Sequence, residues 1–366
     1  MKLEFPKNFL WGAATSSYQV EGGNKNDWTS FVDAGKACDH YNRFEEDFDI
    51  AKSLGHNVHR FSIEWSRVEP REGEFDEVEI EHYKKVVNAL RERGVEPFVT
   101  LYHWTLPTWL SKKGGWLHKD TPKYFERYVR KIITSCGDVK FWVTINEPNI
   151  YTSNSFLKGV WPPQKKSIFK YFKVLKQLTK AHKNSYKAIK KTNPEAWVGI
   201  SKNNIYFEKI LFANYFWNKR FLNKIKKQQD FIGLNYYFHY KLSGNDNKQV
   251  SDMGWEIYPE GIYHVLKGLK KYNKPIYITE NGLADSKDEK REKFIKSHLR
   301  YVHKAISDGV DVRGYMHWSL LDNFEWDKGF WPRFGLVEID YKTMERKIRK
   351  SALEYAKICK SNFLES

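Results

Sequence analysis

The sequence predicts an α/β protein that folds as a single-domain (β/α)8 TIM barrel over residues 1–366. Three observations predict it. Eight short runs of apolar, β-branched and aromatic residues recur along the chain, amphipathic segments separate them, and no linker-like or low-complexity tract divides the chain. With 366 residues and 41% hydrophobic content, the chain can bury a large core, and α/β barrels commonly exceed the usual size of one domain.

The predicted strands, in order, are Leu10–Ala14, Asn57–Ile63, Pro97–His103, Lys140–Ile145, Trp197–Ser201, Phe231–Tyr237, Pro275–Thr279 and Val312–Trp318. The predicted helices are Asp39–Ser53, Val78–Arg93, Pro122–Ser135, Ile168–Lys191, Ile210–Lys227, Pro259–Lys271, Lys287–Ser307 and Ile348–Lys360. Strands that alternate with helices indicate parallel βαβ units, and eight such units favour a closed barrel. The alternative is a doubly wound open sheet, but no glycine-rich phosphate loop follows any strand. Phe334–Lys347 breaks the alternation and predicts a hairpin that turns at Asp340–Thr343.

The formal charge of +17 raises the possibility of a nucleic-acid or anionic partner. Many of the lysines, however, alternate with an apolar stripe between Lys165 and Lys191, the pattern of a helix with a solvated basic back. We therefore expect no nucleic-acid partner. The pattern leaves the oligomeric state open.

Cys38, Cys136 and Cys359 are odd in number and widely spaced, which favours free thiols in a reducing compartment. No apolar leader segment precedes Trp11, and no apolar run is long enough to span a membrane. We expect a cytoplasmic protein with no membrane partner.

In this fold, functional side chains gather at the carboxyl ends of the strands. The strand ends, and the loops just beyond them, supply Gln19, Arg60, Glu64, His103, Trp104, Asn146, Glu147, Asn235, Tyr237, Glu280, His317, Trp318, Glu325 and Trp326. Indoles stack on sugar faces, while amides and carboxylates bind pairs of hydroxyls. This set therefore predicts a carbohydrate site, in which we expect aromatic residues such as Trp104, beside His103, to bind substrate. We predict no metal and no cofactor, because no acidic, His or Cys group has metal-ligand spacing.

Glu147 and Glu280 end the fourth and the seventh predicted strands. Two carboxyl groups that face each other across a sugar can split a glycosidic bond, one as a protonated acid and one as an ionised nucleophile. Arg60 and the Tyr237 hydroxyl are placed to keep Glu280 anionic, and the charge of Glu280 would raise the pKa of Glu147. Asn146 is placed to bind the neighbouring sugar hydroxyl.

The chain resembles the retaining β-glycosidases of glycoside hydrolase family 1. The matching stretches run in family order: Phe9–Gln19, Ala37–Tyr41, Arg60–Ile63, Thr100–Trp104, Thr144–Pro148, Gly233–Tyr237, Tyr277–Gly282 and Trp318–Trp326. The resemblance implies that Glu147 is the acid/base and Glu280 the nucleophile, supported by Arg60, Asn235 and Tyr237. It implies that Gln19, His103, Asn146, Glu325 and Trp326 hold the sugar above Trp318, and that the Trp318–Ser319 peptide is cis.

Two family substitutions bear on the substrate. Position 147 is Glu, not the Gln of thioglucosidases, so acid assistance to the leaving group is retained. Glu325 stands where 6-phospho-glycosidases carry Ser, and Phe334 where they carry Tyr. Because Glu325 would repel a phosphate, the resemblance implies unphosphorylated sugars.

Family members are several dozen residues longer, and the chain is predicted to be trimmed at Glu21–Trp28, Ser201–Asp230 and Lys241–Val250. These segments normally line the aglycone side. We predict a retaining β-glycosidase that releases the terminal sugar of β-glucosides or β-galactosides, with carboxyl groups about 5 Å apart. The alternatives are a transglycosylase that uses the same intermediate and a carbohydrate-binding pseudoenzyme.

Overall fold

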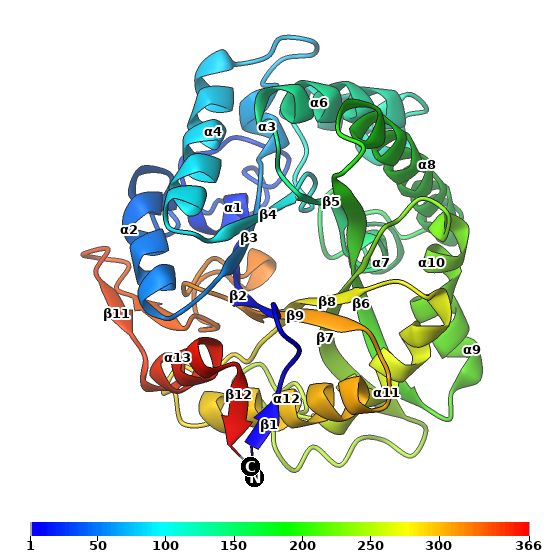
Figure 1. Cartoon of the computed structure of the whole chain (residues 1–366). Helices are drawn as coiled ribbons and strands as arrows, with labels where there is room; N and C mark the ends of the chain where they lie inside the picture. Colours follow the sequence, from blue (N-terminus) through cyan, green and yellow to red (C-terminus); the bar gives the residue numbers. More distant parts are fainter. Residues whose placement is uncertain (1, 366) are drawn as a thin grey trace.

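The computed structural model describes residues 2–365 and contains a closed eight-stranded parallel barrel inside a ring of helices (Figure 1). The barrel strands, in spatial order, are β2 (Leu10–Ala14), β3 (Val58–Ser62), β4 (Glu96–Thr100), β5 (Phe141–Asn146), β6 (Trp197–Glu208), β7 (Ile232–Lys241), β8 (Ile276–Asn281) and β9 (Val312–Trp318). The predicted fold class is confirmed.

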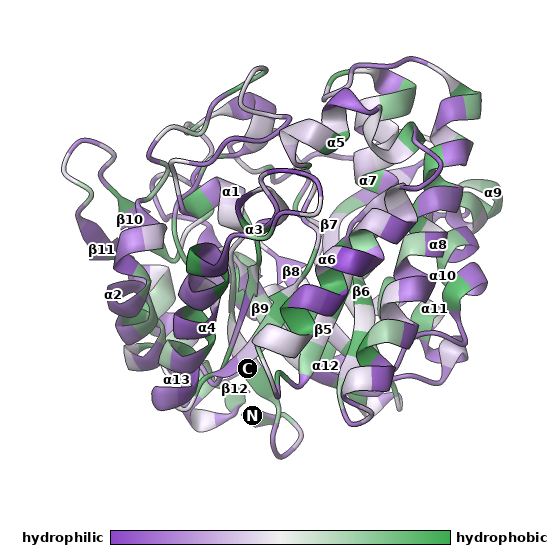
Figure 2. Ribbon diagram, turned by 90° about the horizontal axis from the view of Figure 1, so that it is seen from above, coloured by the Kyte–Doolittle hydropathy of each residue, from purple (hydrophilic) through white to green (hydrophobic). Residues whose placement is uncertain are grey.

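The long outer helices are α2 (His40–Ser53), α4 (Glu77–Glu92), α6 (Thr121–Ser135), α8 (Ile168–Thr192), α11 (Glu260–Leu269), α12 (Arg291–Ser307) and α13 (Lys350–Ser361). Figure 2 shows hydrophilic residues concentrated on these helices and hydrophobic ones on the strands they cover. In α8 the buried side chains include Val174, Leu178 and Ile189, whereas Lys170, Lys173 and Lys176 are exposed. The basic back that the sequence predicted is therefore solvated.

Short helices lie at the carboxyl ends of the strands: α1 (Ser17–Val20), α3 (Trp65–Val68), α5 (Thr108–Lys112), α7 (Pro148–Thr152) and the π-helical η2 (Ser153–Lys158). Of these, α1, α7 and η2 contribute to the wall of the cavity described below. Short 3-10 turns occur at η1 (Gly115–Leu117), η4 (Lys270–Tyr272) and η5 (Trp326–Lys328). The chain ends meet in an antiparallel pair of β1 (Lys2–Glu4) and β12 (Phe363–Glu365), as Figure 1 shows. The predicted hairpin is present as β10 (Val337–Ile339) and β11 (Arg346–Ile348).

Some predicted elements differ from the structure in extent or type. The helix predicted over Ile210–Lys227 is present as a continuous run of α9 (Leu211–Asn214), the π-helical η3 (Tyr215–Lys219) and α10 (Arg220–Ile225), so its middle is π-helical. In this π-helical turn, the Asn218 side chain bonds the backbone of Ile205 in both directions, at 3.0 and 2.7 Å. Strands β6 and β7 also run past their predicted ends at Ser201 and Tyr237. Among residues 2–365, no helix has the length and apolarity needed to cross a bilayer.

The loop after β9 is fixed by the buried carboxylate of Asp322. It accepts hydrogen bonds from Arg349 at 2.8 and 2.9 Å and from the backbone amide of Gly335 at 2.9 Å. Both ion-pair partners are nearly inaccessible to solvent. Because the same loop continues to Glu325 and Trp326, this ion pair holds part of the candidate site.

We expect Asp322→Ala to lower the free energy of unfolding by about 3–5 kcal/mol, because it leaves the buried Arg349 charge with only a 3.9 Å contact to the exposed Glu338 carboxylate. Denaturant unfolding of the purified variant and of the unmodified protein measures the difference in the free energy of unfolding. The matched control is Asp311→Ala, which removes the exposed Asp311–Arg313 pair and should cost at most about 1 kcal/mol. Equal losses in the two variants would contradict the anchoring role of Asp322.

Candidate active site

A cavity of about 480 Å³ opens at the carboxyl ends of the barrel strands. Nine of the predicted site residues line it: Gln19, His103, Trp104, Glu147, Tyr237, Glu280, Trp318, Glu325 and Trp326. The other three, Arg60, Asn146 and Asn235, lie behind its surface with no exposed area. The structure therefore brings the predicted residues together, in two layers.

The inner layer connects the two carboxyl groups. Arg60 donates from Nη1 to Glu280 Oε1 at 2.5 Å and from Nη2 to Asn146 Oδ1 at 2.7 Å. Asn235 donates to Asn146 Oδ1 at 3.3 Å and to Glu147 Oε1 at 2.9 Å. One hydrogen-bonded chain thus runs from Glu280 through Arg60, Asn146 and Asn235 to Glu147.

The backbone around these groups is irregular. Glu147 follows β5 directly and has a positive φ of 44°, and its amide donates to the Ser201 carbonyl at 2.8 Å. The ladder registers shift between Val143 and Asn146 and between Leu234 and Asn235. Bulges and positive φ values of non-glycine residues gather at functional sites because they redirect side chains. Here they lie where the strands end at the cavity.

The two carboxyl groups have different electrostatic surroundings. Burial, followed by the negative charge of Glu280, raises the pKa of Glu147 to about 8. Burial also raises the pKa of Glu280, but the Arg60 guanidinium and the Tyr237 hydroxyl, which donates to Oε2 at 3.0 Å, act in the opposite direction. The arrangement favours a protonated Glu147 beside an ionised Glu280.

His103 is a neutral imidazole at the cavity wall. Burial and the nearby Arg60 hold its pKa well below the ordinary value. Asn146 Nδ2 donates to His103 Nε2 at 3.0 Å, so the ring proton is assigned to Nδ1. This nitrogen is buried and has no hydrogen-bond partner within residues 2–365. It is available to a ligand hydroxyl in the cavity.

The neighbouring part of the wall comes from α1 and the loop after β9. Gln19 Nε2 donates to the Phe324 carbonyl at 2.8 Å and approaches Glu325 Oε2 at 3.4 Å. Burial and the charge of Glu280 raise the pKa of Glu325 to about 8. The rings of Trp318 and Trp326 lie nearly parallel to His103, with centroids 6.0 Å from it. The Trp318–Ser319 peptide is cis, as the resemblance implied.

Trp104 also lies at the wall. Its indole donates to the Asn146 carbonyl at 3.1 Å, and its ring packs 4.8 Å from Trp326. Two of the strand-end residues, Glu64 and His317, do not line the cavity. Glu64 instead accepts hydrogen bonds from Ser17, Ser66 and Thr105.

The sequence interpretation missed the outer part of the cavity. It is lined by Ile150, Asn154, Lys158, Val160, Trp161, Asn203, Ile205, Trp217, Phe238, Tyr240, Met253, Trp255, Asp327, Lys328 and Phe334. Most of these lie on the unpredicted extensions of β6 and β7 or on loops. Phe334 had been singled out through the family resemblance, and Asn203 had a usable signal, since it lies two positions beyond Ser201 and so on the same face of β6.

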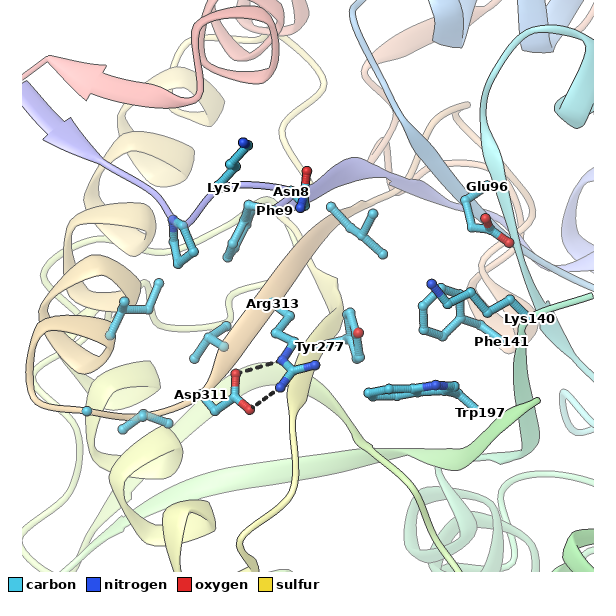
Figure 3. Close-up of a pocket in the computed structure, with 16 residues that line it drawn as sticks. Lys7, Asn8, Phe9, Glu96, Lys140, Phe141, Trp197, Tyr277, Asp311 and Arg313 are labelled. Carbon is cyan, nitrogen blue, oxygen red and sulfur yellow. Dashed lines mark hydrogen bonds and ion pairs between the residues drawn. The ribbon is translucent and has the colours of Figure 1, made fainter. Parts of the chain in front are cut away.

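A second cavity, of about 750 Å³, lies at the opposite, amino-terminal end of the strands. Figure 3 shows Trp197, Phe141 and Tyr277 beside an Arg313 that is paired with Asp311. Its carboxylates are Glu96 and the already paired Asp311. This cavity lacks the two facing carboxyl groups of the first, so we assign the candidate site to the carboxyl end. Within residues 2–365, no cluster of three or more His, Cys, Asp or Glu side chains is arranged to hold a metal ion.

Comparison with known proteins gives consistent matches over the whole chain. The family model described as Glycosyl hydrolase family 1 matches residues 1–209 and 217–363. The 1,4-beta-D-glucan glucohydrolase of Thermotoga neapolitana is 36% identical and covers 99% of each chain. The beta-galactosidase of Pyrococcus woesei is 31% identical and covers 95% of each.

Solved structures agree. The beta-glycosidase from Pyrococcus horikoshii superposes with a TM-score of 0.95 at 40% identity, covering 100% of this chain and 97% of the other. The beta-glucosidase from Thermotoga maritima in complex with noeuromycin gives 0.93 at 35% identity, covering 99% and 100%. The alignment with the T. neapolitana enzyme has 440 positions against 366 residues here, so at least 74 positions have no counterpart in this chain. The predicted shortness is confirmed, whereas the three trimmed places stay predictions.

We expect Glu280→Gln to lower the pKa of Glu147 by about one pH unit or more, because the neutral amide removes the negative charge that opposes ionisation of Glu147. Carbon NMR titration of ¹³C-labelled glutamate carboxyls measures the change. Glu96→Gln, in the amino-terminal cavity, is the control and should leave the pKa of Glu147 unchanged. An unchanged pKa of Glu147 in Glu280→Gln would show that the two groups are not coupled.

Proposed function

Because the chain belongs to glycosyl hydrolase family 1 and is a β-glycosidase, we propose that it removes the terminal non-reducing sugar from unphosphorylated β-glucosides and β-galactosides. Glu280 is the proposed nucleophile and Glu147 the proposed acid/base. Relatives named as beta-glucosidases and a beta-galactosidase support this substrate class. A transglycosylase and a carbohydrate-binding pseudoenzyme, the two predicted alternatives, are not favoured by these relatives.

The observation that carries the assignment of roles is the asymmetry between the two carboxyl groups. Glu280 is paired with Arg60 at 2.5 Å. Within residues 2–365, no cationic side chain forms an ion pair with Glu147, whose side-chain partner is the Asn235 amide. A carboxyl group paired with a guanidinium is suited to stay ionised and attack, and a buried one without an ion-pair partner is suited to carry a proton. The charge of the buried Lys202 lowers the pKa of Glu147, but burial and the charge of Glu280 outweigh it.

In the first step, the Glu147 carboxylic acid gives its proton to the glycosidic oxygen while a Glu280 oxygen attacks the anomeric carbon. The bond from that carbon to the leaving oxygen breaks, and the sugar becomes covalently attached to Glu280. In the second step, the Glu147 carboxylate takes a proton from water, which attacks the same carbon and releases Glu280. Two inversions give net retention, which requires carboxyl groups about 5 Å apart.

The remaining groups are proposed to bind the sugar. His103 Nδ1, Gln19 and Glu325 present donors and acceptors to hydroxyls, while Trp318 and Trp326 offer apolar faces. Asn146, held between Arg60 and His103, is proposed to contact the hydroxyl beside the reacting carbon. Arg60, Asn235 and Tyr237 are proposed to orient the nucleophile.

We also propose that residues 1–366 act as one catalytic domain in the cytoplasm. One apolar core includes residues from Phe5 to Leu364, which supports a single domain. The three cysteines are free and buried, which supports a reducing compartment.

Replacing each carboxyl group separately tests the roles. We expect Glu147→Ala to lower kcat/KM about 10²- to 10⁴-fold for glycosides of poor leaving groups, since general acid catalysis contributes that much. With a 2,4-dinitrophenyl glycoside, whose leaving group needs no acid, added azide should restore turnover by replacing water in the second step, and the product should be the β-glycosyl azide. With Glu280→Ala, azide should instead give the α-glycosyl azide by a single inversion. The same azide product from both variants would refute the assignment.

The charge of the sugar site gives a separate prediction. Above about pH 8, where Glu325 is ionised, a dianionic 6-phosphate would approach the carboxylates of Glu325 and Glu280, and like-charge contacts cost several kcal/mol. We expect kcat/KM for an aryl 6-phospho-β-glucoside to be at least about 100-fold below that for the unphosphorylated glucoside. Glu325→Ser should reduce the ratio of kcat/KM for the unphosphorylated glucoside to kcat/KM for the 6-phosphate. Glu338→Ser, on the exposed hairpin, should leave that ratio unchanged. Equal kcat/KM for the two substrates in the unmodified enzyme would contradict the proposal.

A further inference from the structure

A buried lysine lies beside the proposed acid/base. Lys202, on β6, has no exposed area, and no other lysine of residues 2–365 is buried. Its two chain neighbours both contact Glu147. The carbonyl of Ser201 accepts a hydrogen bond from the Glu147 amide at 2.8 Å, and a hydrogen bond with the Asn203 side chain lowers the pKa of Glu147. Strand β6 therefore holds Lys202 next to the acid/base, although Lys202 does not line the cavity.

The amine of Lys202 lies close to α7, the helix that begins directly after Glu147. Nζ donates a hydrogen bond to the Asn203 carbonyl at 2.6 Å. The same carbonyl accepts a hydrogen bond from the side-chain amide of Asn149, on α7, at 3.3 Å. Because Asn149 lies two positions beyond Glu147, this shared acceptor places the amine beside the segment that carries the acid/base.

This amine has no ion-pair partner. Within residues 2–365, no carboxylate bonds Lys202, whose Nζ instead bonds the Asn203 carbonyl and lies 5.8 Å from the centroid of the Trp217 ring. A carbonyl oxygen and an aromatic face both attract a cation. They do not replace water around an isolated ammonium group, whose burial is costly. The position therefore favours a charged amine only when an anion nearby offsets that cost.

Glu147 supplies that anion when it is ionised. Burial holds the pKa of Lys202 well below the ordinary value, and among the ionisable groups of the described chain it is the charge of Glu147 that raises this pKa. The elements packed against β6 carry other ionisable groups, none of which shifts the pKa of Lys202: Tyr151 on α7, His182 on α8, Lys219 on η3, His264 on α11 and Tyr237 on β7.

The other charges around Glu147 oppose its ionisation. The carboxylate of Glu280, on β8, raises the pKa of Glu147, and Glu147 and Glu325, in the loop after β9, raise the pKa of each other. Arg60, on β3, is paired with Glu280. Lys202 is therefore the cation that remains to stabilise a Glu147 carboxylate, and each of the two charges favours the other.

We propose that Lys202 is a positioning residue whose ammonium group stabilises the carboxylate form of Glu147 during the second step of the reaction. The inference rests on the proposed function and adds to it the group that prepares the base. In that step Glu147 holds a buried negative charge until it accepts a proton from water. The water oxygen bonds the anomeric carbon, and Glu280 leaves as a carboxylate. Lys202 contacts no substrate and transfers no proton to it.

The variant Lys202→Gln tests the charge, because the amide still has a donor for the Asn203 carbonyl. Losing a nearby cation raises the pKa of Glu147, so the alkaline limb of kcat/KM for a p-nitrophenyl β-glycoside should move to higher pH. We expect a shift of about half a pH unit or more, since an opposite charge within about 4–6 Å gives 1–3 units and Lys202 forms no direct ion pair. Carbon NMR titration of the Glu147 carboxyl should show the same rise without turnover. A limb or a carboxyl titration that stays in place would overturn the inference.

The second step is measured with a 2,4-dinitrophenyl β-glycoside, under conditions where a burst of dinitrophenolate shows that release of the sugar limits kcat. We expect Lys202→Gln to lower kcat about threefold or more on the acidic side of its pH profile, which is half a pH unit of lost carboxylate. The acidic limb of kcat should move to higher pH. A lower kcat with an unmoved limb would indicate a structural role for Lys202 and contradict the inference.

Two further variants separate the charge from the hydrogen bond and from lysine loss in general. Lys202→Met removes both the charge and the donor and should shift both limbs as Lys202→Gln does. A shift in Lys202→Met alone would assign the effect to the hydrogen bond and overturn the inference. Lys290→Gln is the matched control, because Lys290 also donates to a backbone carbonyl, that of Val250 at 3.0 Å, but is exposed and does not line the cavity. An equal shift in this control would contradict the role of Lys202.

Failure of the proposed function gives a different result. If the unmodified protein hydrolyses no p-nitrophenyl β-glycoside, the proposed function is refuted, and the inference with it. If the unmodified protein is active and both limbs stay in place in Lys202→Gln, the inference alone is refuted.

Discussion

The carboxyl end of the barrel depends on how three charged groups are buried together. Arg60, Glu280 and Glu147 are all nearly or fully inaccessible to solvent, and isolated charges in such a place are costly. One guanidinium offsets one carboxylate, and Arg60 also bonds Thr100 and the Thr279 carbonyl. The second carboxyl group is left to hold a proton. The difference in protonation that glycosidic cleavage requires thus follows from the pairing of Arg60 with Glu280, since the buried Lys202 acts on Glu147 without forming an ion pair.

The barrel supplies these groups at fixed positions because each comes from a different strand. Arg60 lies on β3, Asn146 ends β5, Asn235 lies on β7 and Glu280 on β8. Parallel strands in a closed barrel bring their carboxyl ends to one rim. The bulges next to Asn146 and Asn235 then adjust the direction of individual side chains. The loop held by Asp322 closes the site on the side opposite the extended carboxyl ends of β6 and β7.

Much of this arrangement could be predicted from the sequence. The barrel strands are recognisable as short apolar, β-branched runs, and most of the site residues lie at the carboxyl ends of those runs. The starts of β2, β6 and β9 agree with prediction to the residue, and Glu280 follows directly from an apolar β-branched run. The extension of β6 was missed since Asn203 and Asn204 resemble a turn when their neighbours are unknown, and the extension of β7 pairs with it. The helix after Ile210 contains a π-helical turn, where Asn218 makes a tertiary contact with Ile205 that the sequence does not reveal. Ile205, Trp217 and Tyr240 look like ordinary core residues in sequence, and only the fold places them in the outer part of the cavity.

The central claim is that Glu280 forms the covalent bond to the sugar, while Glu147 acts as the general acid in the first step and the general base in the second. The most direct measurement is incubation with a 2,4-dinitrophenyl 2-deoxy-2-fluoro-β-glycoside, followed by proteolysis and mass spectrometry of the labelled peptide. The account predicts one fluorosugar per chain, attached to Glu280, and none in Glu280→Gln. A label on Glu147 or Glu325, or turnover without any covalent intermediate, would contradict it.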